Sequence, residues 1–502
     1  MSQRRASRPR GARGQHAARP FLSLLVPLLA FPTLACRIAG EDYERPELTV
    51  PAEFRQAEEA GEAAELGTWW TSFEDPVLDE LIADALAHNV DLRLALIRIR
   101  EARAARGIAE ADLVPTIDAT GSYQRTGQSR EVPLGQFGPR AFDTFTAGLE
   151  SRWELDLWGR LRRAVEAAEA DIHVSVEDAR LVLVSVMAET AVAYIDLRRF
   201  ERQLQIAEAN LELQQQTVSL TERQFDAKLV SQLDVAQARS LLESTRGQIP
   251  LLRAGAQRAR HRLAVLSGRN PGELGANVAF SGEIPAGTIG NPSPPSELLR
   301  RRPDLRAAER ALAAQTARVG VAEGLLYPTL ELSGQLGFQA LDANDLSTDN
   351  ARFFGIGPAV RWNLFDRGRL HGAVAVEDAR VEQALAAYEL ALLVALEDVE
   401  NALVDHRESR ARRDALETAV AEARRAVDLS RDRYRQGLVA FQSVLDTQRL
   451  LFQLEAELAD SEASISTALV SLYRSLGGGW EERDVLMVPN DASEEPGTEP
   501  AE

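Results

Sequence analysis

The chain has almost no lysine, cysteine or methionine. Lys228 is the only lysine, so arginine supplies nearly all of the 57 basic residues. The single cysteine, Cys36, excludes a disulfide within one chain. One of the three methionines is Met1, and so few thioether ligands disfavour a protein that handles copper or silver.

Positive charge is also scarce relative to negative charge. The formal net charge is −19, and six arginines but no acidic residue lie before Cys36. Loss of those six charges with the leader would leave a net charge of −25. Nucleic acids repel a chain this acidic, which disfavours polyanion binding as its function.

Long apolar runs and catalytic motifs are both missing. After the leader no stretch of about 18 consecutive apolar residues occurs, which excludes a membrane domain built of helices. The histidines lack metal-binding spacing, and no P-loop, dinucleotide fingerprint or nucleophile elbow is present. Acidic pairs such as Glu177-Asp178 lie inside predicted helices and suit solvated faces or a tunnel lining. We expect no enzymatic activity, cofactor or metal.

The first 35 residues are predicted to be an export signal. An arginine-rich opening precedes an apolar core that is too short and too broken by proline to span a membrane. The end of this core is similar to the lipobox of bacterial lipoproteins: Ala35 fits, whereas Thr33 and Leu34 depart from the usual order. We expect Cys36 to be acylated, for example with palmitate. Arg37 in place of an aspartate favours the outer membrane. The alternative is an ordinary secretory signal in which Cys36 is incidental.

The remaining chain contains an internal duplication. Residues 91–121 align without gaps with residues 304–334, at an offset of 213. Residues 153–161 align with residues 362–370 at an offset of 209, which then persists for about seventy residues. Because the offset is otherwise constant, the two halves are expected to have elements of equal length, with a loop where the offset changes.

Each half shows the same predicted order: a helix, two strands, a very long helix and a shorter helix. Apolar and polar side chains alternate in the strands, as Leu330 and Leu332 do with Glu331. Strands of about ten residues with this pattern are typical of a membrane barrel, but the alternation also suits a half-buried soluble sheet. One apolar face is expected on the last strand: Phe354, Ile356, Val360, Trp362 and Leu364.

Two runs without proline predict the long helices. They extend from Arg160 to about Phe225 and from Arg369 to about Tyr434, each roughly 100 Å at 1.5 Å per residue. The second run carries an apolar stripe at alternating spacings of three and four, which indicates a coiled-coil seam: Leu385, Tyr388, Leu392, Ala395, Val399 and Ala402. Each long helix is expected to turn back as a helical hairpin.

The predicted segments follow in chain order. They are a signal peptide (1–35), a lipid-anchored segment with the first helix (36–112), a first barrel hairpin (113–158), a first tunnel hairpin (159–266), an equatorial connector (267–295), a helix of the second repeat (296–326), a second barrel hairpin (327–366), a second tunnel hairpin (367–476) and an acidic disordered tail (477–502).

Together these features resemble the TolC-like outer-membrane efflux family, particularly its lipoprotein branch. The resemblance spans nearly the whole mature chain. It is carried by Cys36 followed by Asp42-Tyr43-Glu44-Arg45-Pro46, by Arg302-Pro303-Asp304-Leu305, by WELDLWGRL and WNLFDRGRL, and by Leu445-Asp446-Thr447-Gln448.

The resemblance implies a mixed α and β protomer with four membrane strands, twelve in a trimeric barrel, continued by a long α-helical coiled-coil tunnel. It implies a homotrimeric, lipid-anchored outer-membrane channel of a tripartite efflux pump, which passively conducts drugs or other small toxic compounds. The implied partners are a periplasmic membrane-fusion adaptor, an inner-membrane pump and outer-membrane lipid. The alternatives are the channel of a type I protein secretion system and a structural periplasmic coiled-coil scaffold.

Oligomerisation also follows from the strand count. Four strands cannot close a barrel, which needs about eight. An open sheet in lipid would leave backbone groups unpaired, at several kcal/mol each. If the strands span a membrane, a dimer or a trimer is required, and the family implies three copies.

The two predicted hairpin turns carry apolar residues that we expect to contact the adaptor: Leu229, Val230, Leu438, Val439 and Phe441. The alternative is that these side chains pack inside the turns.

A periplasmic aperture is implied near the same turns. Asp446 matches an acidic position of the family's Leu-Asp-x-Gln segment that lines the closed aperture, and Gln442 and Tyr434 are candidates for the bonds that hold it shut. Asp234 is a further candidate, but Ser231-Gln232-Leu233-Asp234 is also a capping pattern at a helix start.

Overall fold

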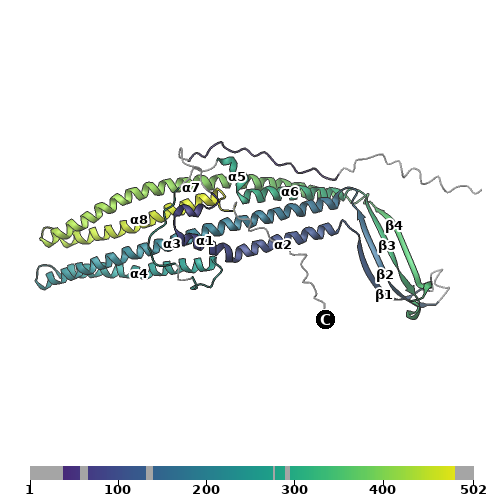
Figure 1. Cartoon of the computed structure of the whole chain (residues 1–502), viewed down its shortest axis with the longest axis horizontal. Coiled ribbons are helices and arrows are strands. Elements are labelled where there is room, and N and C mark those ends of the chain that lie inside the picture. The colour runs from purple at the N-terminus through teal and green to yellow at the C-terminus, as the bar shows by residue number, and fades with distance from the viewer. Residues whose placement is uncertain are drawn as a thin grey trace, which may run out of the picture.

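The computed structural model describes residues 38–56, 66–129, 131, 139–274, 278–288 and 294–480. The predicted signal peptide, Cys36 and most of the predicted acidic tail lie outside these residues. The described protomer is elongated, with long helices at one end and a sheet at the other (Figure 1). The predicted mixed α and β fold class is confirmed.

The elements of the first half are η1 (Trp69–Phe73), α1 (Pro76–His88), α2 (Val90–Ala111), β1 (Thr116–Gly127), β2 (Ala141–Leu155), α3 (Arg160–Asp226) and α4 (Gln232–Leu266). Those of the second half are α5 (Pro295–Arg301), α6 (Pro303–Gly324), β3 (Thr329–Ala340), η3 (Ala343–Asp345), η4 (Asp349–Ala351), β4 (Arg352–Arg361), α7 (Arg369–Arg435) and α8 (Phe441–Ser475).

The α-helices and strands of the two halves follow the same order. The long helices α3 and α7 have 67 residues each, and the returning helices α4 and α8 have 35 each. Both long helices follow a glycine in the left-handed conformation, Gly159 and Gly368. The carboxylates of Asp156 and Asp366 accept backbone N–H bonds from the first turns. The same local signals therefore start both helices.

The helix expected before the strands is two helices in each half, α1 and α2 in the first and α5 and α6 in the second. The chain breaks between α1 and α2 at Asn89, whose side chain accepts the N–H of Leu92 at 3.0 Å and donates to the carbonyl of Leu266 at 2.8 Å. Asn89 therefore caps α2 and ties it to the end of α4.

The strands form one antiparallel sheet in the order β1-β2-β3-β4. The prediction that Trp362 and Leu364 continue the last strand is wrong, because β4 ends at Arg361, opposite Thr329 at the start of β3. Beyond this point β4 has no paired neighbour. The Trp362 indole instead donates to the carbonyl of Leu326 at 3.0 Å.

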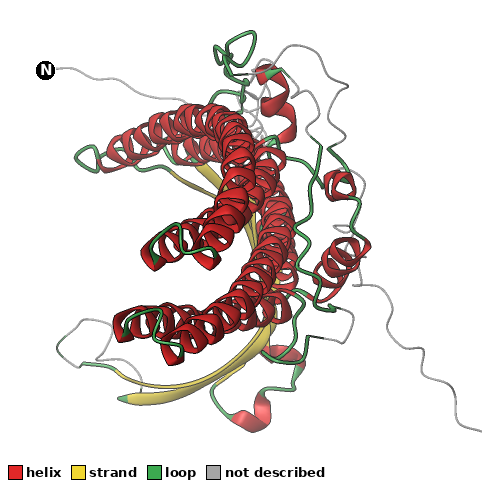
Figure 2. Cartoon of the chain, turned by 90° about the vertical axis from the view of Figure 1, so that its left-hand side faces the viewer, coloured by secondary structure: helices red, strands yellow, loops and turns green. Residues whose placement is uncertain are grey.

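The main core lies in the middle of the molecule, where α1, α3, α7 and α8 meet. Trp69 is 2% exposed and stacks on Tyr473, with ring centroids 5.5 Å apart. Tyr388, Leu392 and Val399 of the predicted stripe are buried in the same core. The described parts of the connector contain neither helix nor strand apart from Pro295, which begins α5. The long helices follow an arc when seen along the molecule (Figure 2).

In the part of the chain that the structure describes, no helix combines the length and apolar character needed to cross a membrane.

Candidate functional site

Both long hairpins turn at the end of the molecule farthest from the sheet (Figure 1). In the first turn the N–H of Lys228 donates to the carbonyl of Phe225 at 2.8 Å. The N–H of Leu229 donates to the carbonyl of Gln224 at 2.8 Å. This pair of bonds is a Schellman motif, in which a left-handed residue ends the helix.

The second turn has the same geometry but a different residue at its centre. Gly437 and Leu438 donate to Tyr434 and Arg433, both at 2.9 Å. Gly437 has φ 72°, which suits a residue without Cβ, whereas the equivalent Lys228 has φ 62°. A side chain in this conformation costs about 1 kcal/mol. The first turn is therefore strained where the second is not.

The structure divides the predicted docking residues into exposed and packed ones. Leu229 and Leu438 are 75% and 69% exposed. Val230 and Val439 are partly buried against the cluster below the turns. Phe441 is only 3% exposed, so the prediction that it presents an apolar docking surface is wrong. It opens α8, and its ring faces inward toward the neighbouring hairpin.

That cluster, here called the tip core, joins the two hairpins of one protomer. It contains Val218, Ala238, Leu241, Leu242, Tyr434, Phe441, Val444 and Leu445. Tyr434 is 7% exposed and its ring centroid lies 5.2 Å from that of Phe441. Burial and the carboxylate of Asp234 raise the pKa of the Tyr434 phenol, and Thr221 partly offsets this rise. Tyr434 therefore lies in the contact between the two hairpins, and its part in holding the aperture shut stays a prediction.

Asp234 forms the capping box indicated by its sequence. Its carboxylate accepts the N–H of Ser231 at 2.9 Å and the Ser231 hydroxyl at 2.7 Å. The N–H of Asp234 donates to the Ser231 hydroxyl in return. Asp234 therefore supplies a hydrogen-bond acceptor for the backbone N–H that precedes α4.

Asp446 and Gln442 instead lie on the exposed surface of α8. The amide of Gln442 donates to Asp446 Oδ1 at 2.7 Å, and Arg449 Nη1 lies 3.8 Å from the same oxygen. In the described protomer both contacts come from the same helix, so the Asp446 carboxylate remains open to other copies.

A row of polar contacts, here called the polar seam, runs between α3 and α8. Its bonds are Gln448 to Thr217 at 3.0 Å, Asn210 to Glu455 at 3.0 Å and Gln203 to Asp460 at 2.8 Å. The residues of the polar seam were not predicted from the sequence. A signal existed, because Gln203, Asn210 and Thr217 are seven residues apart and so share one face of α3.

The sheet has one polar and one apolar face. Asp118, Glu150 and Gln335 lie opposite one another in one row across three strands. The adjacent row places Leu149, Leu336 and Phe354 on the other face: Leu149↔Leu336 and Leu336↔Phe354. On the polar face Arg152 Nε pairs with Glu331 Oε1 at 2.9 Å. A sheet of this kind can separate an apolar medium from water.

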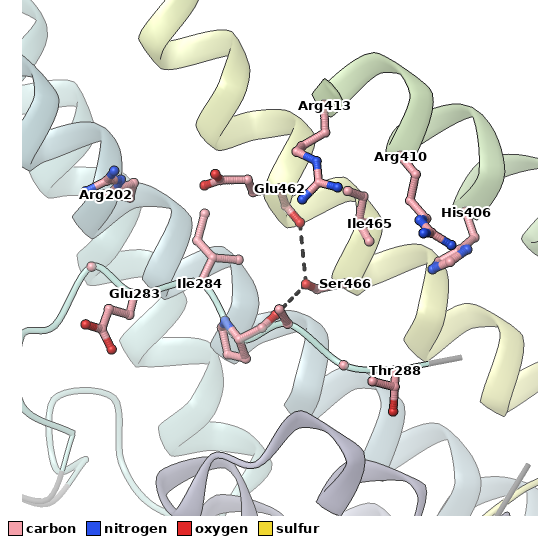
Figure 3. A pocket seen from close by; sticks show the side chains of 14 residues that line it. Arg202, Glu283, Ile284, Thr288, His406, Arg410, Arg413, Glu462, Ile465 and Ser466 are labelled. Carbon is pink, nitrogen blue, oxygen red and sulfur yellow. Dashed lines mark hydrogen bonds between the residues drawn. The ribbon is translucent and has the colours of Figure 1, made fainter. Parts of the chain in front are cut away.

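A pocket of about 810 Å³ lies beside the equatorial connector. Figure 3 shows Arg202, Arg410 and Arg413 around it and Ser466 bonded to the connector. Burial raises the pKa of Glu462 in its wall, and Arg202 and Arg413 partly offset this rise. Throughout the described residues no group of three or more His, Cys, Asp or Glu side chains could hold a metal ion. The tips and the sheet are therefore the stronger candidate sites.

The chain is similar in sequence to known proteins over most of its length. Residues 81–269 and 295–478 match the family described as outer membrane efflux protein. Nodulation protein T of Rhizobium leguminosarum bv. trifolii is 31% identical over 467 residues, which cover 92% of this chain and 97% of that relative. The pyoverdine export outer membrane protein OpmQ of Pseudomonas putida is 34% identical over 417 residues, which cover 82% of this chain and 88% of that relative.

The fold is also similar to that of a solved structure. That of the outer-membrane channel OprN superimposes with a TM-score of 0.81 at 38% identity and covers 88% of this chain and 99% of that chain. The chain therefore belongs to the outer membrane efflux protein family, and its fold is that of an outer-membrane channel.

Proposed function

We propose that three copies of this chain form a closed channel that passively conducts small compounds from a periplasmic pump to the outside. The observation that carries the proposal is that one protomer has open edges both in the sheet and in the layer formed by α2, α3, α6 and α7.

The open sheet edges are β1 and β4. Among the described residues β1 pairs only with β2, and β4 pairs only with β3. In lipid, unpaired backbone groups on both edges would cost several kcal/mol each. If β4 of one copy lies beside β1 of the next, the edges disappear and three protomers form a barrel of twelve strands.

The helical edges are α2 and α7, because α2, α3, α6 and α7 contact one another in that order. Val90, Leu94 and Ile97 share one face of α2 and are 51%, 47% and 42% exposed. On α7, Leu390 and Leu393 are 61% and 63% exposed. The two surfaces differ, so neighbouring copies would meet in a head-to-tail contact. Such contacts form a closed ring when the rotations between neighbouring copies add up to a full turn. The curved layer in Figure 2 has the shape that such a ring requires.

In this assembly the sheet, the helical hairpins and the tips would have different functions. The apolar face of the sheet would contact lipid and its polar face would line the pore. The helical hairpins would continue the pore through the periplasm, and the tips would contact a periplasmic adaptor that connects the channel to an inner-membrane pump. Cys36, which lies outside the described residues, would add a lipid anchor in the outer membrane.

The test combines mass with conductance. Detergent-extracted protein should have a mass of about 165 kDa, three times the 55.0 kDa of one chain before signal removal. It should also conduct ions in planar bilayers. Leu393→Arg should reduce trimer yield, because it places a charge in the proposed contact. Leu438→Arg is the matched control, since Leu438 is equally exposed but lies at the tip.

Each possible failure has a separate meaning. A conducting monomer would contradict the closure by three copies. A trimer that never conducts would favour the structural scaffold over the channel.

A further inference from the structure

We infer that the hairpin tips bind an acidic surface on the periplasmic partner, and that Lys228 supplies the ammonium group that pairs with a carboxylate there. This inference rests on the proposed function, because it concerns the partner that the tips contact in the assembled pump.

The first observation is the conformation of Lys228. Its equivalent in the second repeat is Gly437, in a turn with the same two hydrogen bonds. Glycine suits this left-handed position and lysine does not. The second repeat shows that a glycine can occupy this position without strain. A strained lysine in the first repeat therefore indicates that its side chain has a function.

The second observation is the state of its ammonium group. Lys228 is exposed in the turn and has no ion pair among the described residues. Most arginines of α3 and α4, by contrast, pair with a nearby acid, as Arg239 does with Glu222 at 2.6 Å. Lysine is also used nowhere else in the chain. The ammonium therefore remains available to another molecule, beside the exposed Leu229.

The third observation is the charge of the tips. Residues 222–239 and 431–449 contain seven basic and five acidic residues, a net charge of +2 in a chain of −19. Four of the five acids have a local partner: Glu222 pairs with Arg239, Asp432 with Arg435, and Asp446 with Gln442 and Arg449, while Asp234 lies in its capping box. Three of the seven basic residues, Arg223, Arg431 and Arg435, line a groove of about 530 Å³ between the hairpins, and Arg435 is the one that pairs with Asp432. An acidic partner is therefore attracted to this end of the molecule.

These observations define the complementary surface. It combines apolar depressions for Leu229 and Leu438 with at least one carboxylate within reach of Lys228 Nζ. An ion pair at the edge of such a contact is expected to contribute modestly to affinity and more to orientation.

The first test measures affinity for the purified periplasmic adaptor of the same pump, with the full-length trimer in nanodiscs. Lys228→Arg keeps the charge and should bind within about twofold of wild type, whereas Lys228→Gln should bind about three- to fivefold more weakly. Lys228→Gly should lose as much affinity as Lys228→Gln, although it relieves the strain of the turn. Arg425→Gln is the control for loss of a surface charge, since Arg425 is exposed on α7 ten residues before the turn. A Lys228→Gly trimer that binds as tightly as wild type would overturn the inference.

The second test uses the single lysine as a chemical probe. A water-soluble carbodiimide activates a carboxylate of the adaptor, and Lys228 Nζ displaces the urea to form an amide between the two proteins. Mass spectrometry should locate this bond at Lys228 and at an Asp or Glu of the adaptor, and the species should be missing from Lys228→Arg, whose guanidinium does not react. If no cross-linked species depends on Lys228, the pairing is excluded.

Conductance distinguishes this inference from the function on which it rests. Wild type and Lys228→Gln should conduct alike in bilayers. Loss of conductance in wild type would contradict the channel itself, whereas normal conductance with unchanged adaptor affinity in Lys228→Gln would contradict only the role of Lys228.

Discussion

Two acidic side chains near the turns differ because of where each lies along its helix. Asp234 is the third residue of α4 and bonds to Ser231 in front of it. The equivalent position of α8 is Ser443, and α8 begins after Ala440 without a side-chain cap. Asp446 lies one turn further along, where backbone N–H groups are already bonded within the helix. One carboxylate is therefore used in the fold and the other remains at the surface.

This difference predicts separate effects for the two alanine variants. In the proposed trimer, three copies of Asp446 would form a carboxylate ring, which favours cations. Asp446→Ala should lower the cation preference of the channel, measured as reversal potential in a salt gradient. Asp234→Ala should leave selectivity nearly unchanged and destabilise the first tip by about 1 kcal/mol, through loss of the cap. Wild-type selectivity in Asp446→Ala would eliminate this residue as part of the aperture.

At the scale of elements, the two hairpins of a protomer are held together by apolar and polar contacts in series. The tip core fixes them near the turns, and the polar seam continues toward the equator. Within the seam Gln448 is fully buried and its amide donates to Thr217. Buried hydrogen bonds between helices specify one relative position of the hairpins, because other positions leave polar groups unpaired.

Removal of one seam residue should therefore weaken the contact between hairpins. Gln448→Ala leaves the buried Thr217 without this partner and opens a small cavity, which together should cost about 1–3 kcal/mol. The measurement is the midpoint of urea unfolding of the solubilised protein. Gln442→Ala is the matched control, since Gln442 is exposed six residues earlier on α8 and its side chain bonds, among the described residues, only to Asp446. Equal shifts in the two variants would mean that the seam contributes nothing specific.

At the scale of the whole molecule, the two ends have different surfaces. The sheet end exposes a row of apolar side chains on β4, including Phe354 and Ile356 at 87% and 77%. The opposite end exposes fewer apolar side chains amid charged residues: Leu229 at 75%, Leu233 at 64% and Phe225 at 41% in the first hairpin, and Leu438 at 69% in the second. Broad apolar exposure suits lipid, whereas a few apolar side chains among charged ones suit a specific protein contact.

The tip leucines should therefore affect docking and not assembly. We expect the Leu229→Ser, Leu438→Ser double variant to bind the adaptor at least about tenfold more weakly, because two apolar side chains no longer leave water on binding. Trimer yield should be unchanged. Phe280→Ser is the control, since Phe280 is 51% exposed but lies in the equatorial connector. Unchanged affinity in the double variant would mean that these leucines are not part of the docking surface.

Much of the architecture could be predicted because its signals are local or repeated. The offsets of 213 and 209 predicted paired elements, and the helices indeed have equal lengths in the two halves. Alternation with a period of two predicted which strand residues share a face, and the register agrees for Leu149 and Leu336. The residue at which β4 ends could not be predicted from the alternation, because it depends on where the partner strand β3 begins.

The sequence by itself determined the duplication, the elements and the capping at Ser231, since each depends on residues within a few turns or on a repeated pattern. Only the tertiary structure decided which apolar residues of the turns are exposed. Phe441 and Tyr434 are buried because the second hairpin packs against the first, and Gln448 meets Thr217 across 231 residues of chain. Burial depends on contacts between distant segments, which a local pattern does not contain. The same limit applies to Lys228. The sequence shows that it is the only lysine of the chain, but its left-handed backbone conformation is a property of the folded turn.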